Sequence, residues 1–195
     1  MIDSIDRLQA EARACQLCPL AETRTQVVVG EGRVPSDLMI IGEGPGARED
    51  ELGRPFVGRS GKLLDRLIEE ELGRTRDQVY ITNVVKCRPP NNRDPRPEEM
   101  QACAPWLERQ IVLVKPLVIL LLGRTAVSRV LGSSGVGAGR SLTSLRGHRY
   151  DRSGAVIIPT YHPAYVLRGG AARLTEMRVD FARARLTLSG GSVEV

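Results

Sequence analysis

The chain has 195 residues, of which 42% are hydrophobic and 26% are charged, a composition typical of a globular protein with one buried core. Its longest apolar run covers residues 117–122, far short of the roughly 18 residues that a membrane-spanning helix needs. The first residues are acidic where a secretory signal would be basic. We therefore expect a single domain over residues 1–195, monomeric, cytoplasmic and without a membrane partner.

Basic side chains outnumber acidic ones by 28 to 23, which gives a formal net charge of +5. Only three of the basic residues are lysines, at Lys62, Lys86 and Lys115. The planar guanidinium of arginine suits paired contacts with phosphate, so the bias favours a polyanionic partner such as nucleic acid. A GC-rich genome would produce the same bias without any function, and composition leaves both explanations open.

Apolar periodicity divides the chain into alternating helices and strands. The spacing of Ile5, Leu8 and Ala12 predicts a first helix that ends before Cys15. Further helices are predicted over residues 61–72, 97–114, 123–131 and 174–188, strands over residues 27–29, 38–41, 79–85, 117–122 and 155–159, and a glycine-rich loop over residues 133–140. This alternation indicates an α/β fold with a parallel sheet and helices on both faces, in which ligands bind at the carboxyl ends of the strands.

The four cysteines form a candidate metal site. Cys15 and Cys18 are close together near the N-terminus, whereas Cys87 and Cys103 lie far along the chain. Four thiolates are a complete ligand set for zinc or an iron–sulfur cluster, and a reducing cytoplasm disfavours disulfides. Four unrelated buried cysteines would not explain why three stand in charged or proline-rich segments. Zinc ribbons usually pair two C-x2-C knuckles and this chain has one, so the spacing leans toward [4Fe–4S] but leaves zinc open.

Two glycine-rich segments follow the predicted strand at 38–41. The first, G-E-G-P-G-A-R-E-D at 42–50, places glycines where backbone must approach a ligand closely. It has neither Walker A nor Rossmann spacing, and a plain tight turn would also explain it. The second, G-R-P-F-V-G at 53–58, holds Phe56, one of only two phenylalanines. Its ring could stack on a planar ligand or anchor the loop in the core.

Two polar residues stand at the ends of later strands. Asn83 precedes the cysteine loop, and its amide can both donate and accept hydrogen bonds to a nucleobase edge. His162 follows the strand at 155–159 in the segment H-P-A-Y-V-L-R. A lone histidine is more often structural than catalytic, but this one lies where ligand sites concentrate. The other, His148, stands between arginines and is expected on the surface.

Four segments, taken together, resemble the family 4 uracil-DNA glycosylases, the iron–sulfur branch of that superfamily. They are G-E-G-P-G-x-x-E-D at 42–50, G-R-P-F-V-G at 53–58, T-N-V-V-K-C-R-P-P at 82–90 and H-P-A-Y-V-L-R at 162–168. Each is weak alone, but four in this order with four cysteines are specific, and the match runs from Cys15 to about Arg168. The resemblance implies a DNA-repair enzyme with a three-layer α/β/α fold and a central, mostly parallel sheet. It also implies a [4Fe–4S] cluster on Cys15, Cys18, Cys87 and Cys103.

The resemblance further implies that the protein flips uracil out of DNA and hydrolyses its N-glycosidic bond. By position, Phe56 stacks on the base, Asn83 reads its edge and His162 contacts the O2 side. The backbone of Gly42 and Gly44 borders the base. A hydrogen-bond donor at O2 is chemically reasonable, because negative charge develops on uracil as the bond breaks.

Gly44 departs from the wider superfamily, in which many relatives have an aspartate that activates water. Glu43, Glu49 and Asp50 are therefore the candidates for assisting the attacking water, together with backbone carbonyls. Glu49 is also our candidate for the barrier against the methyl group of thymine. A related branch traps its product on a histidine, but residues 88–99 contain none, so ordinary turnover is expected.

The expected partner is uracil-containing DNA, single- or double-stranded. Arg88, Arg93 and Arg96 near the cysteines are proposed to face phosphates, and Leu167 with Arg168 matches the segment that enters the duplex. Two alternatives stay open. One is a glycosylase of the same superfamily with altered specificity, for example for hypoxanthine or xanthine. The other is a non-catalytic nucleic-acid-binding protein with a structural metal site.

Overall fold

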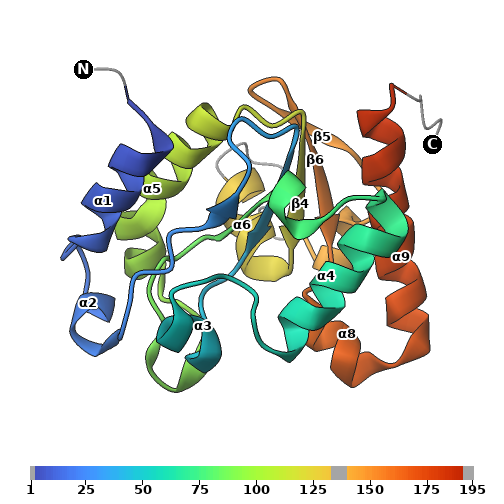
Figure 1. The fold of residues 1–195 in the computed structure, drawn as a ribbon. Helices are drawn as coiled ribbons and strands as arrows, with labels where there is room; N and C mark the ends of the chain where they lie inside the picture. The colour runs from blue at the N-terminus through green and yellow to red at the C-terminus, as the bar shows by residue number, and fades with distance from the viewer. Residues whose placement is uncertain (1–2, 133–139, 191–195) are drawn as a thin grey trace.

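The structure is a computed structural model that describes residues 3–132 and 140–190. Its centre is a six-stranded mixed sheet with the strand order β1-β3-β2-β4-β6-β5 (Figure 1). The four inner strands are parallel to one another, and the two edge strands are antiparallel to their neighbours. The strands are β1 (Glu31–Gly32), β2 (Leu38–Gly42), β3 (Tyr80–Asn83), β4 (Val118–Leu122), β5 (Tyr150–Arg152) and β6 (Ala155–Thr160).

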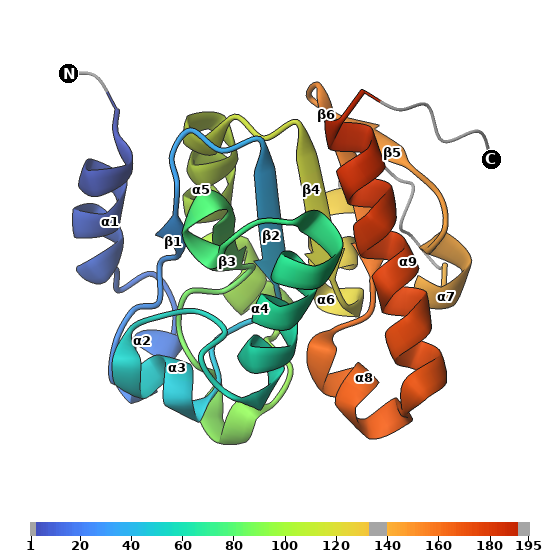
Figure 2. The same ribbon diagram turned by 45° about the vertical axis from the view of Figure 1, so that its right-hand side comes forward.

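Helices cover both faces of the sheet, as the alternation of elements predicts. Figure 2 shows α4 and α9 in front of the sheet and α5 and α6 behind it. The helices are α1 (Ile5–Arg13), α2 (Leu20–Thr23), α3 (Ala47–Leu52), α4 (Arg59–Leu72), α5 (Pro97–Val114), α6 (Arg124–Leu131), α7 (Leu142–Leu145), α8 (Pro163–Gly169) and α9 (Ala171–Leu188), with short 3₁₀ turns η1 (Arg76–Gln78) and η2 (Pro90–Asn92). Within these described residues, no helix is both long and apolar enough to span a bilayer.

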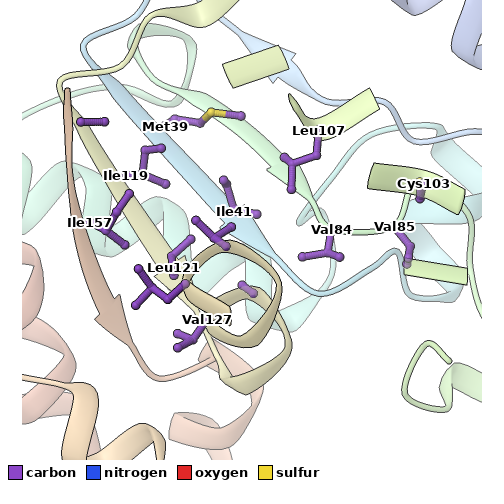
Figure 3. Close-up of a cluster of buried hydrophobic side chains, with 14 of the residues drawn as sticks. Met39, Ile41, Val84, Val85, Cys103, Leu107, Ile119, Leu121, Val127 and Ile157 are labelled. Carbon is purple, nitrogen blue, oxygen red and sulfur yellow. The ribbon is translucent and has the colours of Figure 1, made fainter. Parts of the chain in front are cut away.

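The inner strands are buried on both faces, because they carry apolar side chains without interruption. Successive side chains alternate between the faces, so Met39 and Ile41 of β2 point toward α5 and α6 while Leu38 and Ile40 point toward α4 and α9. Figure 3 shows the first of these two layers, which includes Ile119, Leu121, Ile157, Leu107 and Val127. Truncating one such core side chain to alanine costs about 2–5 kcal/mol. Two apolar layers therefore hold the strand ends rigidly in place.

Recognisable signals set the ends of the long helices. Helix α5 begins at Pro97, the favoured first-turn residue, and the main-chain N of Arg96 donates to Glu99 Oε2 at 2.7 Å. Helix α4 ends at Gly73, whose φ of 63° is the left-handed cap that glycine adopts without strain. Both helices match their predicted ranges closely. The predicted helices at 123–131 and 174–188 are also confirmed, as α6 and α9.

The structure corrects two sequence predictions. Residues 27–29 form no strand, and Val28 instead lies in a buried connection whose main-chain N donates to the Lys86 carbonyl at 2.8 Å. Strand β3 ends at Asn83 and not at residue 85, because the next two amides turn to bond the carbonyls of Gly42 and Glu43. Strands β1 and β5 and helices α2, α3, α7 and α8 were not predicted. Most of the predicted loop at 133–140 lies outside the described residues.

Candidate active site

A cavity of about 640 Å³ opens at the carboxyl ends of β2, β3 and β6. This is the end of a parallel sheet at which ligand sites are expected. Residues of the four sequence segments meet there. The lining includes Glu43, Gly44, Glu49, Phe56, Asn83, Arg93, His162 and Arg168.

Gly42 lets two of these side chains lie against the end of β2. Strands β2 and β3 pair in a register that sets Gly42 beside Asn83. A Cβ atom at residue 42 would lie 2.4 Å from Phe56 Cζ and 2.5 Å from Asn83 Oδ1. Both distances are far below van der Waals contact, so only glycine leaves room for both side chains.

Phe56 is fixed in an unusual backbone conformation. Its φ of 50° is left-handed, which is strained for an aromatic residue, and its side chain is only 5% exposed. The loop is held by Arg76, whose guanidinium donates to the main-chain oxygens of Pro55 and of Phe56, the latter at 3.2 Å. Gly61 packs directly on the Phe56 carbonyl, where a Cβ would lie 1.8 Å away. The ring is thus presented as a rigid face of the cavity.

Asn83 carries an unsatisfied acceptor into the cavity. The residue is 1% exposed, and its Oδ1 atom is buried without a hydrogen-bond partner in the described part of the chain. Leaving a buried acceptor unpaired costs about 1–3 kcal/mol. Such an atom is matched by a ligand that brings a hydrogen-bond donor.

His162 is a neutral ring with a defined tautomer. It caps the N-terminus of α8, and its Nδ1 atom accepts a hydrogen bond from the main-chain N of Ala164 at 3.2 Å. Burial lowers the pKa of His162 to about 4, and the positive charge of Arg168 acts in the same direction. Because Nδ1 is an acceptor, the ring proton is on Nε2. The imidazole is a neutral hydrogen-bond donor at physiological pH.

Glu43 is a half-buried carboxylate at the cavity wall. Its Oε2 atom accepts a hydrogen bond from the hydroxyl of Thr125 at 2.5 Å. Burial raises the pKa of Glu43 above its ordinary value, although the Thr125 hydroxyl opposes the shift. A carboxylate with a raised pKa and one oxygen left for water is suited to accept a proton.

The other two acidic candidates hold loops. Glu49 lines the cavity, and its Oε1 atom accepts hydrogen bonds from the main-chain N atoms of Val57 and Gly58, both at 2.9 Å. Asp50 lies outside the cavity lining and is 3% exposed. Its Oδ1 atom accepts hydrogen bonds from the main-chain N atoms of residues 25 and 26, at 2.9 and 3.2 Å. Glu49 therefore supports the loop that carries Phe56. Asp50 supports the segment at residues 25 and 26 and does not line the cavity.

Gly44, which the sequence analysis singled out for its missing side chain, is closely packed. A Cβ at residue 44 would lie 2.7 Å from Val85 Cγ2. A larger residue would displace the chain that follows β3. The packing of this loop therefore leaves no room for a side chain at residue 44.

The four cysteines line a second, narrow cavity between α1, α5 and the segment after β3. All are free thiols, and Cys87 and Cys103 are buried. Nitrogen donors point at three sulfur atoms: the guanidinium of Arg24 at Cys87 Sγ (3.4 Å), the main-chain N of Lys86 at Cys103 Sγ (3.3 Å) and the indole of Trp106 at Cys15 Sγ (3.4 Å). Among residues 3–132 and 140–190, no three His, Cys, Asp or Glu side chains are placed to hold a single metal ion.

Comparison with known proteins decides the family. The model of the uracil DNA glycosylase superfamily matches residues 29–184. The type-4 uracil-DNA glycosylase of Thermotoga maritima is 49% identical over 169 residues, which cover 86% of this chain and 85% of the relative. That of Sulfurisphaera tokodaii is 46% identical over 170 residues (85% and 77%), and that of Saccharolobus solfataricus is 43% identical over 192 residues (96% and 88%). The chain belongs to the type-4 branch of the uracil-DNA glycosylase superfamily.

Two of the four arginines that the sequence assigns to DNA line the cavity. Arg93 and Arg168 line its mouth, but the Arg93 guanidinium is already paired with Glu99 at 2.6 and 2.8 Å. Arg88 donates to Asn92 Oδ1 at 2.7 Å, and Arg96 is exposed at the start of α5. Leu167 is 45% exposed on α8.

Several residues of the glycosylase site were missed by the sequence analysis. Arg59, Ser60, Asn92, Asp94 and Tyr165 also line the cavity, and Thr125 reaches it from α6 through Glu43. Their side-chain types are common on protein surfaces, so only the folded chain distinguishes them. Tyr165, which lies within the segment at 162–168, and Arg59, which directly follows the segment at 53–58, carried the usable signals.

Proposed function

We propose that this protein removes uracil from DNA by hydrolysing the N-glycosidic bond and leaves an abasic site. The observation that carries the proposal is the cavity in which Phe56, the unpaired Asn83 Oδ1 and the neutral His162 converge. Family membership supports the same activity, since the relatives are named type-4 uracil-DNA glycosylases.

Asn83 is suited to distinguish uracil from cytosine. The N3–H group of uracil is a donor that would satisfy the buried Oδ1 atom, and the Asn83 amide nitrogen can donate to uracil O4. Cytosine has an acceptor at N3 and an amine at position 4, so it would leave the buried oxygen unpaired. A site built around such a bond rejects a ligand that lacks the matching donor.

His162 is suited to stabilise the departing base. As the bond between C1′ and N1 breaks, its electron pair passes to uracil and negative charge develops on O2. The neutral imidazole donates from Nε2, so it can stabilise that oxyanion without itself losing a proton. Phe56 would stack on the face of the flipped base and so fix the orientation of its plane in the cavity.

Glu43 is the best-placed group to assist the water. Water attacks the cationic C1′ carbon and loses a proton, and the Glu43 carboxylate lines the cavity with a pKa raised by burial. Of the three acidic candidates, it alone lines the cavity without holding the main chain of another loop. Glu43 is therefore proposed as the proton acceptor.

The cysteine cavity is proposed to hold a [4Fe–4S] cluster. Four thiols around one cavity supply the ligands that such a cluster requires, and nitrogen donors aimed at the sulfurs are a common feature of these sites. The cluster would join the end of α1 to α5 and to the segment after β3, so its role is structural.

The deciding experiment uses single- and double-stranded oligonucleotides with one uracil, followed by alkaline cleavage of abasic sites. We expect strand cleavage at uracil and none at cytosine or thymine. Parallel oligonucleotides with hypoxanthine or xanthine test an altered specificity. Tight DNA binding without any base release would indicate a binding protein and would refute the proposal.

A further inference from the structure

Lys86 lies between the cysteine cavity and the base cavity. It is 1% exposed and lines the cysteine cavity just before Cys87. Its Nζ atom donates to Thr82 Oγ1 at 2.8 Å and to the main-chain oxygen of Asn83 at 2.5 Å. One buried side chain therefore touches the residue that reads the base and borders the proposed cluster.

The charge of Lys86 has no carboxylate partner within residues 3–132 and 140–190. Both acceptors of its ammonium are neutral oxygens. A buried cation without a counter-charge is strongly destabilising. The ionisable groups that face Lys86 are the thiols of Cys87 and Cys103. Four thiolates around an iron–sulfur cluster would supply the negative charge that this ammonium requires.

A buried network extends from Lys86 toward α5. The Thr82 hydroxyl donates to the Val29 carbonyl at 2.7 Å. The side-chain amide of Gln110, on α5, donates to the same carbonyl at 2.7 Å and to the Tyr80 hydroxyl at 2.9 Å. Because α5 also carries Cys103, this network ties the helix of one cluster ligand to β3, the strand that ends in Asn83. Networks of fully buried hydrogen bonds hold their members in one arrangement.

We propose that Lys86 is a positioning residue that couples the cysteine site to base recognition. Its ammonium fixes the carbonyl of Asn83 at the end of β3 and so orients the amide that reads uracil. The same charge balances the thiolates. This inference rests on the proposed glycosylase function and on the proposed cluster, and it assigns to Lys86 a role that is neither catalysis nor metal ligation.

The test compares Lys86→Met with Lys62→Met, which removes an exposed lysine on α4. Methionine keeps the apolar stem and removes the charge. We expect Lys86→Met to lower the single-turnover rate of uracil release about 10- to 100-fold, because a buried carbonyl loses its partner. The reduction potential of the cluster should become more negative, because a nearby positive charge stabilises the reduced form. Lys62→Met should change neither quantity.

Thr82→Val provides a second variant that keeps the charge of Lys86. It removes one acceptor of the ammonium, so it should slow uracil release by a smaller factor and leave the reduction potential at the parental value. If Lys86→Met does not fold, a parental rate in Thr82→Val overturns the positioning role. If Lys86→Met folds and keeps both the parental rate of uracil release and the parental reduction potential, the whole inference is overturned. If the parental protein releases no uracil or contains no iron, it is the proposed function or the cluster that has failed.

Discussion

The rings of Phe56 and His162 lie with their centroids 5.8 Å apart and their planes inclined by 32°. Phe56 and His162 are far apart in the sequence, so only the fold brings them together. A planar base stacked on Phe56 would have one edge close to the imidazole. In the proposed function, this geometry would connect base stacking by Phe56 with the hydrogen bond that His162 donates to the departing O2 atom.

His162→Ala should therefore affect the rate more than binding. The hydrogen bond to O2 strengthens as charge develops, so its loss should lower the single-turnover rate about 10²- to 10³-fold and leave DNA affinity nearly unchanged. Rapid-quench kinetics and DNA titration measure the two quantities. Equal losses of rate and affinity would instead indicate that His162 binds the DNA.

The pH profile of the parental enzyme tests the charge state of His162. Its pKa of about 4 lies below the ordinary value of about 6.5, so the folded state binds the proton less readily than the unfolded state. As pH falls from about 6.5 toward 4, the unfolded state is therefore favoured and stability is lost. Between pH 6 and 8 we expect no titration of His162 in the rate. A single-turnover rate that falls as pH rises through about 6.5 would refute a neutral donor, provided that His162→Ala does not show the same fall.

Asn83→Asp tests base recognition. An ionised aspartate accepts hydrogen bonds and cannot donate one to uracil O4, but it can accept from the exocyclic amine of cytosine. Uracil release should fall sharply, and some release of cytosine should become measurable on the same oligonucleotides. Parental uracil release in this variant would place base reading elsewhere.

Gly42→Ala should close the cavity without unfolding the protein. The added methyl group would meet Phe56 and Asn83 at 2.4 and 2.5 Å, so one of the two side chains must move. Gly132→Ala is the matched control, because a Cβ there has no neighbour within 4 Å among residues 3–132 and 140–190. We expect the first variant to lose most of its uracil release, with the control near parental, at similar melting temperatures. Full activity in Gly42→Ala would show that the contact is not needed.

Local sequence signals were sufficient for the long helices and for the existence of the four inner strands, although not for the end of β3. Proline and acidic residues at 97–99 and glycine at 73 mark helix ends that the structure reproduces. The short helix α8 was missed because a seven-residue helix has little periodicity, and its start depends on His162 acting as the cap. The supporting contacts were also beyond prediction. That Arg76 holds the Phe56 loop depends on a tertiary distance that no motif encodes.

Removal of the proposed cluster should destabilise the protein before it affects the chemistry. We expect about four irons per chain and a brown colour. Cys103→Ala, which removes the ligand on α5, should lower the melting temperature and the iron content together, since metal binding contributes to folding. Zinc in stoichiometric amount without iron would contradict the cluster. The indole of Trp106 donates to Cys15 Sγ at 3.4 Å, so tryptophan fluorescence should report the loss of iron directly.

The last prediction concerns the arginines that are proposed to face DNA. Arg88→Gln, Arg96→Gln and Arg168→Gln should each weaken binding to all sequences alike and reduce the slope of log affinity against log salt by about 0.9 per lost phosphate contact. Arg93→Gln should have a smaller effect, because its guanidinium is already paired with Glu99.

Arg185→Gln is the control, since this exposed residue lies in the last turn of α9, at the opposite end of the sheet from the cavity (Figure 1). It should leave the salt dependence unchanged. Fluorescence anisotropy at several salt concentrations measures every variant on one uracil-free duplex. If the triple substitution of Arg88, Arg93 and Arg96 binds like the parental protein while Arg185→Gln weakens binding, the DNA-facing side has been assigned to the wrong end of the sheet.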